Sequence, residues 1–258
     1  MKMTKKISAA CLVVAGVLSG TGNAQTQHQP IKNIVLVHGA FADGSSWSKV
    51  IPILEARGFH VVAVQNPLTS LSDDVNATKR TVALQDGPVI LVGHSWGGAV
   101  ITQAGEDPKV VGLVYVAAYV PDEGKSANET SDPYGLTAGQ KTIQVDAQHF
   151  ASISAYGVLN YFAEGLPMPE RRLVLAVQGQ TYGPMLAEKL TYAAWKTKPS
   201  WHVISTQDHL LSPAMEEAGA KKARGIAIHL STCHVAMLQE PDKVADAITE
   251  AAKGSAKQ

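Results

Sequence analysis

Apolar and polar positions alternate in blocks along residues 31–119 and again along residues 201–252. Short runs of largely apolar residues predict strands, because β-branched residues with few polar interruptions suit strands buried on both faces. These runs cover 31–37, 59–64, 89–92, 110–119, 201–205 and 225–230. Segments between them carry apolar residues three and four apart and predict helices, at 46–57, 71–84, 98–104, 213–224 and 242–252. The alternation predicts an α/β fold, with a mostly parallel sheet and helices on both faces.

The segment from about 121 to 199 breaks this pattern. It contains no strong strand and six prolines, with short helical pieces expected at 169–177 and 184–195. It is too long for a simple connection, and its tyrosines and tryptophan argue for packing rather than a disordered linker. We therefore expect a helical cap inserted over the functional site, where substrate selection and exclusion of water take place.

The first residues have the pattern of a secretory signal peptide. Three lysines precede the uncharged apolar stretch 7–18, and the small residues Gly22-Asn23-Ala24 follow it. This stretch is shorter than the roughly 20 residues that span a bilayer, so a stable membrane anchor is not expected. The prediction is a signal peptide at 1–24, a single domain at 25–258, and a periplasmic or secreted protein.

Composition narrows the possible partners. The 258 residues carry a formal net charge of +0, which gives no indication of nucleic acid binding, and 45% are hydrophobic, enough for one large core. Of the two cysteines only Cys233 lies outside the expected signal peptide, so no intramolecular disulfide is expected. No cluster has metal-ligand spacing and no glycine loop fits a nucleotide, so no metal and no cofactor are predicted. Whether the protein is a monomer or a dimer stays open.

The segment Gly93-His94-Ser95-Trp96-Gly97 directly follows the apolar run 89–92. It matches the G-x-S-x-G nucleophile elbow, a sharp strand-to-helix turn. Bulky side chains on either side of the serine would clash in such a turn, and Gly93 and Gly97 remove those clashes. The turn would present the Ser95 hydroxyl at the end of the strand, near the positive end of the next helix.

A second signal follows the first strand, as His38-Gly39-Ala40-Phe41. A strand that ends in His-Gly supplies half of an oxyanion hole in this architecture. We predict that the backbone N–H groups of Ala40 and Trp96 are the two oxyanion donors. Phe41 and Trp47 lie next to these elements in the sequence and are predicted to bind substrate.

A serine nucleophile needs a base, and the base needs an acid to orient it. Asp208 and His234 follow Ser95 in the order Ser, Asp, His, each in a loop after a predicted strand. Such loops leave a parallel sheet at the same edge, so the three side chains can converge. Asp122 also follows a strand and remains an alternative acid.

These pieces resemble the α/β-hydrolase superfamily, and within it the group of plant methylesterases, hydroxynitrile lyases and many bacterial esterases. The resemblance rests on Val35–Ala40, Leu91–Gly98, Val116–Asp122 and His234–Pro241. It implies triad roles for Ser95, Asp208 and His234. The lyases carry a threonine at the position of Gly39 and a lysine at that of Val235, so both departures favour ester hydrolysis.

The sequence predicts a serine hydrolase that cleaves carboxylic esters through an acyl-enzyme. The predicted substrates are neutral, apolar or aromatic esters with a short acyl chain. A lyase, a cofactor-free oxygenase and a hydrolase-like ligand receptor remain alternatives on the same fold. Neither arginine nor lysine occurs in the loops around the expected site, so a charged acyl group would lack a partner. Cap cations could reverse this argument, namely Lys141, Arg171, Arg172 and Lys189.

Overall fold

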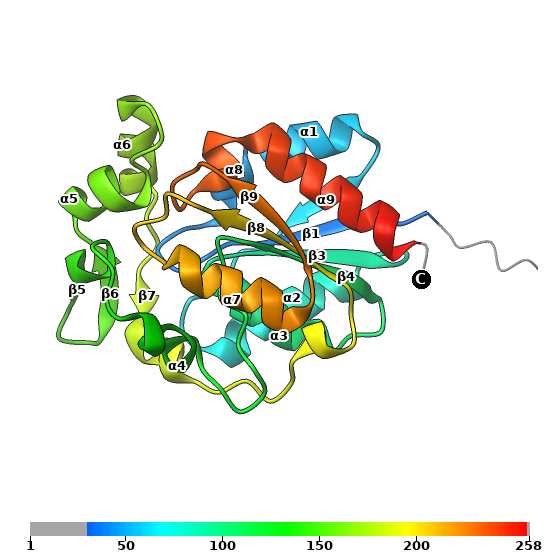
Figure 1. The fold of residues 1–258 in the computed structure, drawn as a ribbon, viewed down its shortest axis with the longest axis horizontal. Helices are drawn as coiled ribbons and strands as arrows, with labels where there is room; N and C mark the ends of the chain where they lie inside the picture. The colour runs from blue at the N-terminus through cyan, green and yellow to red at the C-terminus, as the bar shows by residue number, and fades with distance from the viewer. Residues whose placement is uncertain (1–29, 257–258) are drawn as a thin grey trace, which may run out of the picture.

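The computed structural model describes residues 30–256, so the expected signal peptide lies outside the described residues. Six strands form one sheet in the order β2-β1-β3-β4-β8-β9 (Figure 1). Their bounds are Asn33–Val37 for β1, His60–Ala63 for β2, Val89–His94 for β3, Val110–Val116 for β4, Ser200–Ser205 for β8 and Ile226–Leu230 for β9. Each neighbouring pair is parallel. The α/β fold with a parallel sheet is confirmed.

Helices cover both faces of this sheet (Figure 1). One face carries α1 (Val50–Ala56) and α9 (Pro241–Ser255), and the other carries α2 (Leu71–Ala83), α3 (Trp96–Ala104) and α7 (Pro213–Ala223). The central strands β1 and β3 are buried along their whole length, as their apolar runs predict. The sheet core is therefore closed from both sides.

The helix expected at 46–57 is divided in two. Gly44–Trp47 forms a 3-10 turn, in which the Asp43 side chain accepts a hydrogen bond from Ser45 N at 2.7 Å, and α1 begins at Val50. Pro52 thus lies in the first turn of α1, where the N–H that proline lacks would have no partner within the helix.

The cap joins β4 to β8. Its helices are α4 (Ala127–Ser131), α5 (Ala155–Gly157) and α6 (Met168–Ala176), and its strands β5 (Ile143–Val145), β6 (Phe150–Ile153) and β7 (Thr181–Tyr182) form an antiparallel sheet. The expectation of a helical cap was therefore incomplete, because strands of two to four residues are too short to show a period in the sequence. The helix expected at 184–195 is also absent, and only 3-10 turns occur there, at Gly183–Ala187 and Ala194–Lys196.

Hydrogen bonds hold the cap against the loops at the carboxyl ends of the sheet strands. Phe41 N donates to Thr181 Oγ1 at 3.0 Å, and Thr137 Oγ1 donates to Leu210 O at 2.9 Å. These contacts join β7 and the segment before β5 to the loops after β1 and β8. The cap therefore lies over the edge of the sheet where the predicted site residues occur.

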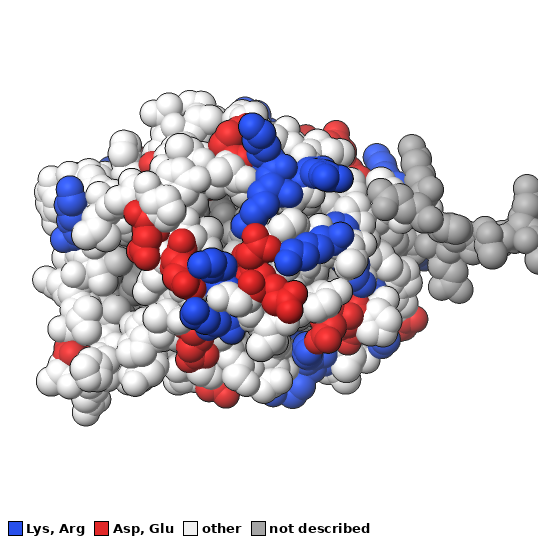
Figure 2. Space-filling model, turned by 60° about the horizontal axis from the view of Figure 1, so that its bottom comes forward, with Lys and Arg blue, Asp and Glu red and all other residues white. Residues whose placement is uncertain are grey.

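Charges of both signs are mixed on the face shown in Figure 2, while the cap end, at the left, carries few charged residues. Within residues 30–256, no helix combines the length and apolar character needed to cross a bilayer.

Candidate active site

Ser95 lies at the turn between β3 and α3 with φ 52° and ψ −119°, a conformation that a residue with a side chain rarely adopts. A Cβ atom added to Gly93 would overlap the backbone of Gly97, and one added to Gly97 would overlap Val37 O. The two glycines are required by this close backbone approach, as the elbow motif predicts. The turn carries strain of the kind that concentrates at functional sites.

Ala40 and Trp96, whose backbone N–H groups are the predicted oxyanion donors, line the cavity that contains Ser95. Among residues 30–256, neither amide donates a hydrogen bond to another group of the chain. Trp96 N–H is at the start of α3, where helical amides have no partner within the helix. Both N–H groups are thus free of protein partners among the described residues, and their role as oxyanion donors stays a prediction.

Asp74 holds the Trp96 side chain by a hydrogen bond to the indole N–H. The sequence did not indicate Asp74 as a residue of the site. Trp96 Nε1 donates to Asp74 Oδ2 at 2.7 Å, and Leu68 N donates to Asp74 Oδ1 at 2.9 Å. Burial raises the pKa of Asp74 to about 6, although both hydrogen bonds act in the opposite direction. No spacing in the sequence indicates this contact, since Asp74 lies on the polar first turn of α2.

Asp208 and His234 are in direct contact. His234 Nδ1 lies 2.5 Å from Asp208 Oδ2, and Asp208 Oδ1 accepts hydrogen bonds from Leu210 N at 2.7 Å and Leu211 N at 2.9 Å. Because a carboxylate only accepts, this arrangement assigns the imidazole proton to Nδ1. Nε2 of His234 is left as an acceptor, buried and without a hydrogen-bond partner among the described residues.

The alternative acid, Asp122, lies elsewhere. Its carboxylate pairs with Lys196 at 3.1 Å and with Lys222 at 3.6 Å, and its side chain is 36% exposed. The loop after β8 rather than the loop after β4 therefore brings an acid to His234.

Aromatic rings enclose His234. The His94 ring lies 4.6 Å from the His234 ring and the Phe162 ring lies 5.2 Å from it, while His94 Nε2 donates to His234 O at 3.0 Å. Burial lowers the pKa of His94 well below its ordinary value, so this ring is neutral. Trp47 is fully buried and packs edge-on against His94 at 6.5 Å, in the core rather than at the wall of either cavity described below.

Glu216 is a second buried acid that the sequence did not indicate. Its Oε2 accepts a hydrogen bond from Ser205 N at 3.0 Å. Burial, and then the negative charge of neighbouring Asp208, raise the pKa of Glu216 well above its ordinary value. A protonated Glu216 avoids a second negative charge beside Asp208.

The cavity at the nucleophile, here called the Ser95 cavity, has a volume of about 240 Å³. Its walls contain only uncharged side chains: Ala40, Phe41, Ser95, Trp96, Tyr119, Asn128, Leu136, Gln140, Ile143, Leu186, Leu210 and Leu211. Burial raises the pKa of Tyr119 to about 12, so its phenol is neutral as well. Of the two residues predicted to bind substrate, Phe41 lines this cavity and Trp47 does not.

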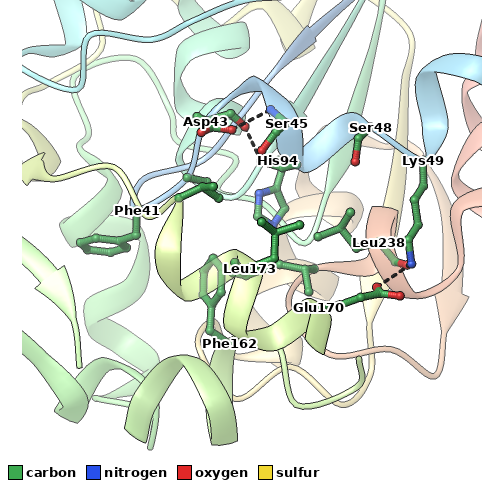
Figure 3. A pocket seen from close by; sticks show the side chains of 15 residues that line it. Phe41, Asp43, Ser45, Ser48, Lys49, His94, Phe162, Glu170, Leu173 and Leu238 are labelled. Atoms are coloured by element: carbon green, nitrogen blue, oxygen red, sulfur yellow. Dashed lines mark hydrogen bonds and ion pairs between the residues drawn. The ribbon is translucent and has the colours of Figure 1, made fainter. Parts of the chain in front are cut away.

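A larger, mostly apolar pocket of about 450 Å³, here called the base-side pocket, adjoins the residues around His234 (Figure 3). It is lined by Phe41, Ala42, Asp43, Ser45, Ser46, Ser48, Lys49, His94, Phe162, Glu170, Leu173, Val174, Val177, Val235 and Leu238. Lys49 Nζ pairs with Glu170 Oε2 at 2.6 Å and donates to Leu238 O at 3.0 Å, so its charge is compensated.

The four cap cations that the sequence left open line neither cavity. Arg171 donates to the carbonyl groups of Leu159 and Leu166, and Lys189 lies 3.6 Å from a Glu129 oxygen. Of the lysines and arginines in the part of the chain that the structure describes, only Lys49, from the loop before α1, lines one of these two cavities.

Comparison with known proteins identifies the family of this chain. A family model described as the alpha/beta hydrolase family matches residues 34–247. This chain belongs to the α/β-hydrolase family. A probable hydrolase, R7, of Phoma sp. is 29% identical over 247 residues, which cover 85% of this chain and 97% of that protein. A pyrethroid hydrolase of Sphingobium wenxiniae is 25% identical and covers 88% of this chain and 89% of its own length.

Plant methylesterases are also relatives of this α/β-hydrolase, as the sequence motifs predict. Methylesterase 8 of Arabidopsis thaliana is 24% identical over 74% of this chain and 78% of its own length. Among solved structures, polyneuridine aldehyde esterase superposes with a TM-score of 0.76 at 18% identity, over 85% of this chain and 98% of that one. The distant relatives of this chain thus include hydrolases and esterases.

Proposed function

We propose that this α/β-hydrolase cleaves neutral carboxylic esters through an acyl-enzyme on Ser95. The observation that carries the proposal is the Asp208–His234 contact at 2.5 Å, which leaves His234 Nε2 as an unpartnered acceptor. The named activities of its relatives, esterases and hydrolases, support the same reaction class.

The reaction follows from these groups. Ser95 Oγ attacks the ester carbonyl carbon while His234 Nε2 takes the hydroxyl proton. Asp208 keeps the other imidazole proton on Nδ1 and stabilises the imidazolium that forms. When the tetrahedral intermediate collapses, the C–O bond to the alcohol breaks and His234 returns the proton to the leaving oxygen. Water, activated by the same His234, then releases the acid and restores Ser95.

The Ala40 and Trp96 amides are assigned as donors to the carbonyl oxygen as it becomes an oxyanion. One such donor is worth about 2.7–4 kcal/mol where it has been removed by mutation in other enzymes. Asp74 fixes the Trp96 indole, so we assign it a positioning role at the second donor.

The neutral charge of the substrate follows from the Ser95 cavity, whose walls contain no charged side chain. A carboxylate placed there would lose its hydration without gaining an ion pair, at a cost of several kcal/mol.

The test is turnover of p-nitrophenyl acetate and butyrate by Ser95→Ala and by a matched control, Ser72→Ala, whose hydroxyl is on the exposed side of α2. We expect Ser95→Ala to lose turnover and Ser72→Ala to retain it. Undiminished turnover by Ser95→Ala would refute the proposed nucleophile.

A further inference from the structure

Phe41 belongs to the walls of both cavities at the site. Its backbone has φ 59°, a rare conformation for an aromatic residue, and its N–H is held by the buried Thr181 Oγ1 at 3.0 Å. The cap therefore holds the backbone of Phe41 in place. The two cavities therefore adjoin at Phe41.

The base-side pocket lies on the side of the site that holds the base. Three of its lining residues adjoin His234: Val235 follows it in the chain, and the rings of His94 and Phe162 pack against its imidazole. In the proposed reaction the carbonyl oxygen of the ester lies at the Ala40 and Trp96 amides, and both of these residues line the Ser95 cavity. The leaving oxygen must lie near His234, because the base returns its proton to that atom.

Helix α6 gives the base-side pocket an apolar wall that is partly exposed to solvent. Leu173 is 62% exposed and Val177 is 37% exposed, yet both side chains line the pocket, and α6 buries none of its residues. Figure 3 shows Leu173 beside Phe162 and His94, with the compensated Lys49–Glu170 pair at the far side. An apolar ligand would cover this wall, since removing apolar surface from water is favourable.

We propose that the base-side pocket binds the alcohol part of the substrate and the Ser95 cavity binds the acyl part. The pocket volumes of about 450 Å³ and 240 Å³ then set the substrate class. It consists of esters of a large apolar or aromatic alcohol with a smaller, neutral acid. This inference rests on the proposed function, because it assigns the two halves of an ester to the two sides of Ser95.

Two isomeric esters test the assignment. 1-Naphthylmethyl acetate has the large group on the alcohol, and methyl 1-naphthylacetate has the same group on the acid. We expect the first to have the higher kcat/KM, by about tenfold or more, equivalent to about 1.4 kcal/mol of additional transition-state binding. Equal rates, or a preference for the second isomer, would overturn the assignment.

Two variants, at leucine side chains of similar solvent exposure, show which cavity is responsible for the difference in kcat/KM. Leu173→Trp narrows the base-side pocket, and Leu136→Trp narrows the Ser95 cavity at a leucine that is 71% exposed. We expect Leu173→Trp to lower kcat/KM for 1-naphthylmethyl acetate about tenfold and to lower kcat/KM for methyl 1-naphthylacetate much less. Leu136→Trp should instead lower kcat/KM for methyl 1-naphthylacetate. The inference fails if Leu173→Trp lowers both isomers alike.

Binding separates this inference from the proposed reaction. In Ser95→Ala, 1-naphthylmethanol should bind more weakly once Leu173→Trp is added, by about tenfold in Kd measured by calorimetry. An unchanged Kd would refute the alcohol pocket even if the esterase activity is confirmed. If instead no ester is cleaved, the proposed reaction fails, while this Kd still decides what the pocket binds.

Discussion

Replacing Asp208 by Asn tests the acid of the triad through the geometry around its two oxygens. Oδ1 accepts hydrogen bonds from Leu210 N and Leu211 N, and Oδ2 receives His234 Nδ1. In Asp208→Asn the two backbone N–H groups require the amide oxygen at the Oδ1 position. The amide NH₂ then faces His234 Nδ1, and two donors cannot bond to each other.

The expected consequence is a change of tautomer. His234 would carry its proton on Nε2 and could no longer take the Ser95 proton, although the ring stays in place. The corresponding change in a serine protease lowers kcat about 10⁴-fold, which is about 5 kcal/mol in the activation free energy. Because the fold keeps both backbone hydrogen bonds, the melting temperature should change little compared with this loss of activity.

The assay is the initial rate of p-nitrophenyl acetate hydrolysis, with Asp122→Asn as the matched control. Asp122 follows β4 as Asp208 follows β8, but it pairs with Lys196 and Lys222 at the surface. Asp122→Asn should therefore retain most of its activity. The reasoning is refuted if Asp208→Asn keeps more than about a tenth of the wild-type kcat, which is under 1.4 kcal/mol, or if Asp122→Asn suffers the larger loss.

Three further predictions follow from buried groups. The pKa of Glu216 in the folded protein lies above its ordinary value of 4.5, so the unfolded chain releases this proton first and the wild-type protein loses stability as pH rises above that value. Glu216→Gln removes this loss, so its free energy of unfolding in urea should rise relative to that of wild type between about pH 5 and pH 8. A difference between the two proteins that does not change with pH would contradict this. Burial raises the pKa of Cys233 to about 11, so an aromatic disulfide reagent should not label the native protein, and rapid labelling at neutral pH would refute that. Monomethyl succinate should be cleaved much more slowly than methyl butyrate, and a preference for the carboxylate-bearing ester would indicate a cation at the acyl part.

Ser95, Asp208 and His234 each follow an apolar strand of a parallel sheet, and the ends of such strands meet at one edge. The structure brings Asp208 and His234 into contact, but His234 Nε2 has no hydrogen-bond partner among the described residues, so the role of Ser95 as nucleophile stays a prediction. The sequence favours Asp208 as the acid but does not exclude Asp122. Both aspartates follow strands, and only their contacts in three dimensions distinguish them, with His234 in one case and with surface lysines in the other.

The cap and the cavity walls depend on contacts between segments that are distant in the chain. Lys49 meets Glu170 across 121 positions, and Phe41 meets Thr181 across 140. No local periodicity encodes such pairs. Closeness in the sequence can also mislead. Trp47 is close to Phe41 in the sequence, but it packs against His94 in the core and not at the site.

The central claim is that Ser95 forms a covalent acyl-enzyme, and its most direct test is active-site labelling with a fluorophosphonate followed by peptide mass spectrometry. The account predicts one adduct per chain, on the peptide that contains Ser95, together with loss of ester hydrolysis in proportion to labelling. An adduct on any other residue, or full labelling that leaves the hydrolysis rate unchanged, would contradict it.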